Sequence, residues 1–208
     1  MPNARVCCLF LLLSLTACVR ETVSDTQPLS ERIPVDIPTP ELDLGTWPAP
    51  AQLGSFALQG EVHLAHRHLR ILRYSRPAGE QTQQLELQLT PIPGGWEDMT
   101  PSRLVAGHYG PLRQHLGERA LERGALEVWV EQEGAEAEPT MPQPVATGEV
   151  WVQYPTRRAV TLLSVTALPP VFVSATVTGR PEQAQALADA QREALLDYAA
   201  ATAATAQD

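Results

Sequence analysis

Apolar residues recur at every second position over residues 56–64, which is the pattern of a half-buried β-strand. The parity of the apolar positions changes after Leu64, so we expect a turn or bulge within residues 65–68 and a second strand over residues 69–75. A third alternating run covers residues 85–89 and ends at Pro91. Three consecutive strands joined by short turns favour an antiparallel sheet.

Helical signals follow this first group of strands. Thr100 before Pro101 is a typical N-cap and first-position pair, and Gly107, Gly110 and Pro111 are expected to break the helix in two. The second of these short helices is predicted over residues 111–123, with Gly124 as its C-terminal stop. A last helix is predicted from Pro181, with an apolar stripe that is expected to pack on the core: Leu187, Ala194, Leu195 and Tyr198.

Four further strands are predicted between the helical segments, over residues 126–130, 150–154, 160–168 and 171–177. Residues 131–147 read as an acidic, proline-containing loop, in which Glu131, Glu133, Glu136 and Glu138 are expected to be solvated. The predicted fold is therefore α+β, an antiparallel sheet of about seven strands with two helical segments packed on it.

The N-terminal part of the chain has a different composition. Arg5, an apolar run over residues 6–15 and the small residues Thr16 and Ala17 form the pattern of a secretory signal peptide. Residues 18–50 are rich in proline and are predicted to form a tether, although the alternation of Ile33, Val35 and Ile37 also allows a docked strand. We therefore expect a signal peptide over residues 1–17, a tether over 18–50 and a single domain over 51–208.

The string Leu15-Thr16-Ala17-Cys18 resembles the lipobox of bacterial lipoproteins. The resemblance implies that the signal is cut before Cys18 and that Cys18 carries acyl chains such as palmitate. In that family an Asp after the cysteine favours the inner membrane, so Val19 implies the outer membrane, facing the periplasm. The expected contact with the membrane is then made through the lipid on Cys18.

The amino-acid composition excludes several kinds of partner and catalytic group. The formal net charge is −9, which does not suit nucleic acid as a partner. The chain has no lysine, which excludes Schiff-base and P-loop lysine chemistry. Its cysteines are Cys7, Cys8 and Cys18, so the domain has neither a disulfide nor a thiolate metal site, and no cofactor is expected.

The segment His63-Leu64-Ala65-His66-Arg67-His68 is the strongest candidate for a metal site. In a strand, His66 and His68 would point to one face, close enough to share a metal ion. Gly60, five intervening residues and His66-x-His68 match the start of a cupin metal box. The glutamate that this box requires four or five residues later is absent, so a solvated hairpin tip is the competing interpretation.

Each of the other candidate groups has a functional and a structural interpretation. His108, Tyr109 and His115 could form an acid–base pair with Asp98 or Glu118, but no nucleophile is adjacent, and Ser102 and Ser164 lack a nucleophile-elbow context. The second strand carries basic residues that could bind a carboxylate or phosphate or simply be solvated: Arg67, Arg70, Arg73 and Arg76. Trp96 stands apart, whereas Trp129 and Trp151 either cover the second face of the sheet or form an exposed aromatic patch.

The order of elements resembles that of Mog1/PsbP-like domains, some of which are bacterial lipoproteins. That resemblance implies a small binding or assembly-factor domain. We therefore interpret the chain as a non-catalytic, lipid-anchored envelope module that binds an envelope protein. The alternatives are a periplasmic carrier or chaperone for a hydrophobic ligand, and a metal-dependent enzyme using His66 and His68.

Overall fold

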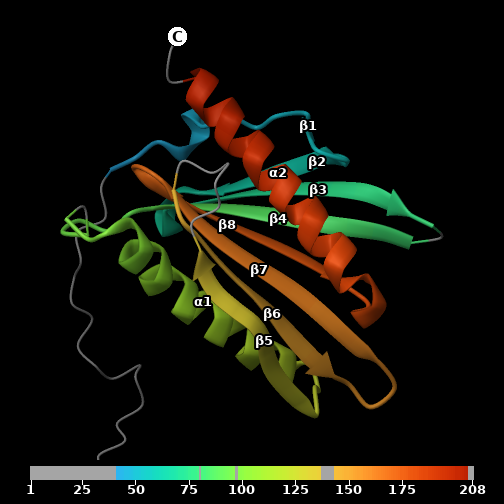
Figure 1. Cartoon of the computed structure of the whole chain (residues 1–208). Helices are drawn as coiled ribbons and strands as arrows, with labels where there is room; N and C mark the ends of the chain where they lie inside the picture. Colours follow the sequence, from blue (N-terminus) through green and yellow to red (C-terminus); the bar gives the residue numbers. More distant parts are fainter. Residues whose placement is uncertain (1–40, 80, 97, 137–142, 206–208) are drawn as a thin grey trace, which may run out of the picture. The chain divides into compact units, whose positions relative to one another are not determined.

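The computed structural model describes residues 41–79, 81–96, 98–136 and 143–205, which all belong to one compact unit. An eight-stranded antiparallel sheet carries one helix on each face (Figure 1). The strands lie in the order β1-β2-β3-β4-β8-β7-β6-β5. Their bounds are β1 Gln52–Leu53, β2 Phe56–Leu64, β3 Leu69–Ala78, β4 Gln81–Pro91, β5 Glu127–Glu136, β6 Val145–Gln153, β7 Arg158–Leu168 and β8 Val171–Gly179. The predicted α+β class is confirmed, with the two-residue β1 as the additional strand.

The two helices cover opposite faces of the sheet. Helix α2 (Ala184–Thr205) crosses in front of the strands in Figure 1 and packs against β7, β8 and β1. Helix α1 (Pro101–Glu122) packs on the other face, against β5, β6 and β7. Successive residues of β7 therefore enter different cores, because Leu162 packs toward α2 and Leu163 toward α1.

The expected break in the first helical segment is wrong: α1 is continuous, with Pro111 inside it. One of the clashes that a proline makes inside a helix is with the Cβ of the residue before it, and here that residue is Gly110, which has none. Gly107 leaves room for the Trp96 ring, which lies 3.1 Å from the place where a Cβ would be. Burial of Leu104 and Val105 on the sheet then outweighs the lost hydrogen bond.

Helix α1 ends as the sequence predicts. Gly124 has φ +87°, a conformation that costs glycine little. Its N–H donates to the Leu121 carbonyl, and the N–H of Ala125 donates to the Ala120 carbonyl, which together form a Schellman motif.

The acidic loop is shorter than predicted, because β5 continues through Glu136 and β6 begins at Val145. The two strands pair over residues 134–136 and 145–147 as well as over the predicted stretch. Glu131 and Glu133 therefore belong to a strand, whereas Glu138 lies outside the described residues.

Residues 41–50, which the sequence analysis placed in the tether, contact the domain where the structure describes them. Leu44 is fully buried in the core between the sheet and α2, with Leu42 and Trp47 packed at its margin. The Tyr198 hydroxyl of α2 donates to the Pro48 carbonyl at 3.2 Å. The predicted signal peptide, Cys18 and the alternating residues Ile33, Val35 and Ile37 lie outside the described residues. None of the described helices is long and apolar enough to cross a membrane.

Candidate functional site

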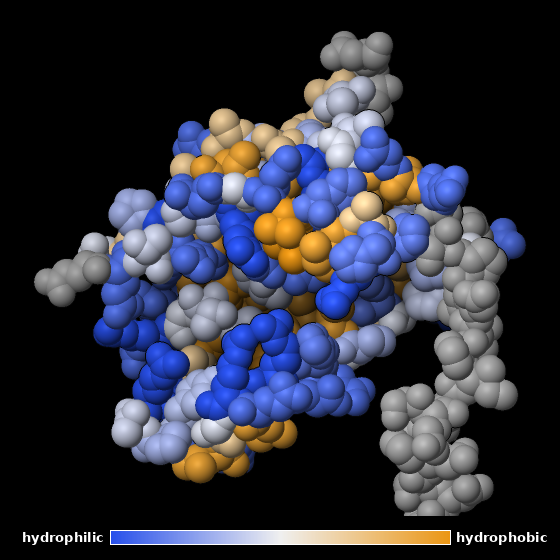
Figure 2. All heavy atoms as spheres, turned by 180° about the vertical axis from the view of Figure 1, so that it is seen from behind, coloured by the Kyte–Doolittle hydropathy of each residue, from blue (hydrophilic) through white to orange (hydrophobic). Residues whose placement is uncertain are grey.

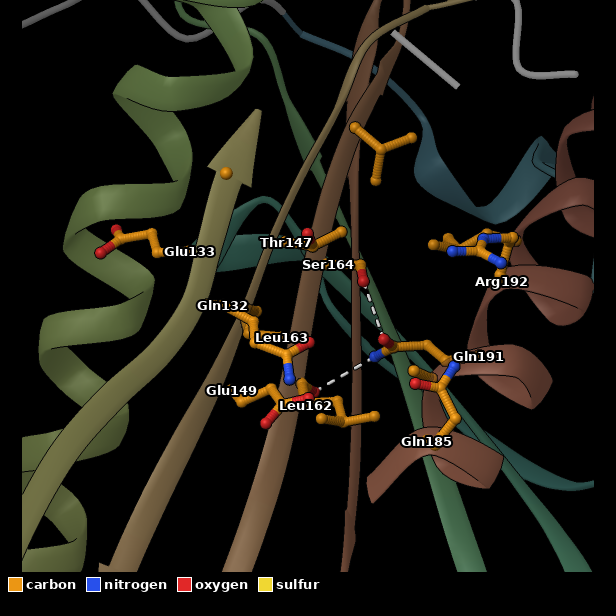
Figure 3. Close-up of a pocket in the computed structure, with 15 residues that line it drawn as sticks. Gln132, Glu133, Thr147, Glu149, Leu162, Leu163, Ser164, Gln185, Gln191 and Arg192 are labelled. Carbon is orange, nitrogen blue, oxygen red and sulfur yellow. Dashed lines mark hydrogen bonds between the residues drawn. The ribbon is translucent and has the colours of Figure 1, made fainter. Parts of the chain in front are cut away.

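A cavity of about 460 Å³ lies between α2 and the strands β5, β6 and β7 (Figure 3). Its walls come from elements far apart in sequence, with Gln185, Gln191 and Arg192 on α2 facing Thr147, Glu149 and Ser164 on the sheet. Apolar side chains such as Leu162 and Leu195 make up only part of the lining. This mixed lining differs from the apolar lining that a carrier for a hydrophobic ligand requires.

The buried amide of Gln191 sets the floor of this cavity. Its Nε2 donates to the carbonyls of Leu162 at 3.1 Å and Ala175 at 2.9 Å, and its Oε1 accepts from the Ser164 hydroxyl at 2.7 Å. These bonds join α2 to both β7 and β8 and satisfy the polar atoms of the amide. Ser164, considered above as a nucleophile, therefore has a structural hydrogen bond instead.

A ladder of paired side chains lies beside the cavity on β5 and β6. Trp129 is directly opposite Trp151, and their rings stack with centroids 6.0 Å apart and an angle of 18°. The next pair on the same face is Glu131 opposite Glu149. Each indole N–H donates to a carboxylate of its own strand, Trp129 to Glu131 at 2.8 Å and Trp151 to Glu149 at 3.0 Å.

This acidic pair has an unusual environment. Glu149 is only 6% exposed and lines the cavity, whereas Glu131 is exposed. Like charges directly opposite one another in a sheet are destabilising, and the described residues offer neither carboxylate an arginine. The two tryptophans are half-buried on the face opposite α1, so the ladder combines an aromatic surface with two carboxylates that form no ion pair within the described residues.

The rim of the cavity is formed by a β-bulge in the edge strand β5. The register shifts between Glu131 and Gly134, and Gln132 has φ +49°, which is uncommon for a residue with a side chain. Arg113 of α1 holds Glu133 through two hydrogen bonds of 2.6 and 2.8 Å. Bulges and charged side chains protect a sheet edge, so β5 is poorly suited to pair with a strand of another chain.

The histidine segment forms the turn predicted within residues 65–68, at the tip of the hairpin between β2 and β3, and His66 and His68 are exposed there. Residues Ala65–Arg67 are a 3-10 helix, and His68 has φ +47°. The premise that His66 and His68 point to one face of a strand is therefore wrong. His63 lies on β2, and the described part of the chain holds no group of three or more potential ligands that could bind a metal ion.

His108 lies on α1 and is half-buried against the sheet. Its ring stacks on Phe172 with centroids 4.2 Å apart, and its Nε2 lies 3.3 Å from the Thr90 hydroxyl. Burial lowers the pKa of His108 to about 4. Glu118 accepts a hydrogen bond from Gln114, while His115 and Ser102 are exposed. These contacts assign His108 to packing rather than to an acid–base pair.

The arginines of the second strand have separate structural roles. Arg70 is 4% exposed and donates to the carbonyls of Leu44 at 2.8 Å and Trp47 at 2.5 Å, with Glu61 as its ion-pair partner. Arg73 pairs with Glu86 at 3.3 Å. Arg76 donates to Gln83 at 2.7 Å and lies over the Phe56 ring at 4.7 Å. Arg70 is thus held in the core, whereas the contacts of Arg73 and Arg76 occupy only some of the donors of their guanidinium groups.

Gln191 and Gln132 line the cavity, but nothing in the sequence marks them as residues of a site. Gln191 occupies a position of the predicted apolar stripe of α2, where a glutamine gives no signal of burial. The opposition of Glu131 and Glu149 depends on the register of β5 and β6, which the predicted loop had concealed.

No protein-family model matches the chain, and a search of curated protein sequences finds no match. Among solved structures, the chain is similar to LpqN of Mycobacterium tuberculosis, described as involved in cell envelope biogenesis, with 12% identity, a TM-score of 0.41 and coverage of 71% of this chain and 78% of LpqN. It is also similar to the Ran-binding protein Mog1p of Saccharomyces cerevisiae, with 12% identity, a TM-score of 0.34 and coverage of 73% and 95%. The Mog1-like resemblance thus reappears only weakly, and neither likeness bears on what this chain binds.

Proposed function

We propose that the protein is a non-catalytic, lipid-anchored binding module of the bacterial cell envelope, which captures an envelope protein at the ladder and cavity beside α2. The observation that carries this proposal is the stacked pair Trp129 and Trp151 beside the opposed carboxylates of Glu131 and Glu149. Half-buried aromatic rings provide contact area at low entropic cost, and they are enriched where proteins bind one another.

The chemistry of this surface specifies the partner. An arginine or lysine of the partner would relieve the repulsion between Glu131 and Glu149, and its charge would also be attracted to the adjacent indole face. Because β5 is bulged and acidic, the partner binds through side chains rather than by adding a strand.

The mixed lining of the cavity argues against the alternative of a carrier for a hydrophobic ligand. The metal-dependent alternative has no support from the described residues, where the histidine segment brings no third ligand together. The proposed role as a binding module requires only a surface, and the ladder provides one.

Site-directed photo-crosslinking in intact cells tests the proposal. A photoreactive residue at Gln185, which is exposed and lines the cavity, should yield one defined protein adduct. The same residue at Leu121, which is 53% exposed on α1, serves as the control position and should not yield that adduct. Glu131→Gln and Trp129→Ala should each abolish the adduct at Gln185. An adduct of equal yield at both positions, or one insensitive to both substitutions, would contradict the proposal.

The anchor is tested separately. Labelled palmitate should enter the wild-type chain and not Cys18→Ser, and only the wild type should fractionate with membranes, since stable anchoring needs more than one acyl chain. Equal labelling of the two proteins would disprove lipidation at Cys18 without affecting the binding surface.

A further inference from the structure

A second groove, of about 960 Å³, lies on the opposite side of the sheet from the candidate site. It runs between the C-terminal part of α1, at Leu116 and Ala120, and three strand ends. These are the C-terminal ends of β6 and β8 and the N-terminal end of β7. Figure 2 shows this side of the molecule, on which hydrophilic residues predominate and hydrophobic residues form small groups. The groove shares none of its lining residues with the cavity beside α2.

Arginines from three separate parts of the chain line this groove. They are Arg119 and Arg123 of α1, Arg157 and Arg158 of the turn into β7, and Arg180 after β8. All five are exposed. Glu182 is the one acidic residue of the lining, and within the described residues no carboxylate forms an ion pair with any of the five guanidinium groups.

Two of these arginine side chains make contacts that orient them without neutralising their charge. Arg158 donates from Nε to the Gln153 side chain at 2.7 Å, which leaves its terminal nitrogens available. The Arg157 guanidinium lies over the Tyr154 ring, 5.1 Å from its centroid. A guanidinium held against an aromatic face keeps its fork of donors free along its edges.

Threonine hydroxyls rather than carboxylates lie between the arginines. Thr161, Thr176 and Thr178 line the groove, and the hydroxyls of Thr161 and Thr178 are 2.9 Å apart. A hydroxyl can donate to an anion, so these neutral groups are compatible with bound negative charge.

The concentration of positive charge contrasts with the net charge of −9. Five like charges around one groove repel each other, and this repulsion is relieved when an anion enters. Arginine matches phosphate oxygens through two parallel hydrogen bonds, which makes it the preferred side chain for binding phosphate. The acidic remainder of the chain disfavours a long polyanion such as nucleic acid.

We propose that this groove binds a phosphate-bearing molecule. The side chains that contact the phosphate are those of Arg119, Arg123, Arg157, Arg158 and Arg180. A lipid headgroup and a soluble phosphate ester both carry this group, and the same contacts recognise both. This site is distinct from the partner-binding surface beside α2, and it does not depend on the function proposed for that surface.

Calorimetric titration of the purified full chain in a non-ionic detergent tests the proposal. The probes are inorganic pyrophosphate, short-chain phosphatidic acid below its micelle concentration, and a single-stranded oligothymidylate. The first two should bind, with affinity that falls as salt rises. Arg119→Gln/Arg157→Gln should weaken binding by about tenfold or more, because two charged donors to the phosphate are lost.

The matched control is Arg67→Gln/Arg103→Gln, which removes the same charge at two exposed positions that do not line the groove. It should bind both phosphate probes with nearly wild-type affinity. Tighter binding of phosphatidic acid than of pyrophosphate identifies a lipid source, and the reverse order identifies a soluble one. The proposal is overturned if neither phosphate probe binds, if both double variants lose affinity equally, or if the oligothymidylate binds more tightly than both.

Discussion

Gln191 of α2 and Ser164 of β7 are joined by a buried hydrogen bond of 2.7 Å, in which the Ser164 hydroxyl donates to the Gln191 side-chain oxygen. The amide nitrogen of Gln191 meanwhile donates to carbonyls of β7 and β8. An amide at this position fixes the height and rotation of α2 above the sheet. It thereby sets the width of the cavity beside the Trp129–Trp151 ladder.

Replacement of Gln191 by Met keeps the length of the side chain but removes its polar atoms. The carbonyls of Leu162 and Ala175 and the Ser164 hydroxyl would lose their partner, so the free energy of unfolding should fall by about 2–4 kcal/mol. Denaturant melts measure this change. Gln185→Met on the exposed face of α2 is the control and should change stability by less than about 0.5 kcal/mol. Equal effects of the two substitutions would show that the buried network is dispensable.

Arg70→Met should release residues 44–47 from the sheet, because the carbonyls of Leu44 and Trp47 accept hydrogen bonds from the Arg70 side chain. We expect a loss of about 2–4 kcal/mol in stability, since buried acceptors are left unsatisfied. Limited proteolysis should cut the variant within residues 42–50 and leave this segment of the wild type intact. Arg73→Met removes only an exposed ion pair and should reproduce the wild-type pattern. A wild-type chain cut readily near Ala51 would contradict the docking of residues 44–47.

His108 makes stability depend on pH. Because its folded pKa is lowered to about 4 from 6.5, the unfolded chain binds more protons between these values. Stability is therefore lost as the pH falls from about 6.5 toward 4. Between pH 7 and pH 4.5 the wild type should lose about 2.5 kcal/mol more than His108→Phe, which keeps a ring against Phe172. Parallel loss of stability in the two proteins would exclude His108 as the source.

Much of the fold follows from the sequence because seven strands carry a period-two pattern long enough to recognise. The strand β1 has only two residues, Gln52 and Leu53, and no period can be read from so short a segment. Local propensity predicts a break of α1 at Pro111, because propensity does not include the burial of Leu104 and Val105 against the sheet. The ends of β5 and β6 were missed because Glu131 and Glu133 resemble loop residues until the opposite strand is known.

The candidate site was less predictable, since it depends on register and on contacts between distant segments. The sequence assigns Trp129 and Trp151 to the second face of the sheet or to an exposed aromatic patch, but their pairing requires the alignment of β5 with β6. The change of parity after Leu64 predicted the turn at residues 65–68, and the 3-10 helix in that turn excludes the strand geometry that a metal ion shared by His66 and His68 would need. The arginines of the second groove are scattered over residues 119–180, and the net charge of the chain concealed their convergence.

The affinity of the crosslinked partner for the purified chain tests the central claim most directly. Titration with that partner should give a dissociation constant at least about tenfold weaker for Trp129→Ala than for the wild type, because aromatic contacts at the centre of an interface contribute about 2 kcal/mol or more. Glu131→Gln should weaken binding and reduce its dependence on salt, since the partner's basic group would lose its counter-charge. Leu121→Ala, which removes an exposed apolar side chain from α1, should bind like the wild type. Wild-type affinity in both Trp129→Ala and Glu131→Gln, with both variants folded, would contradict a partner-binding role for the ladder.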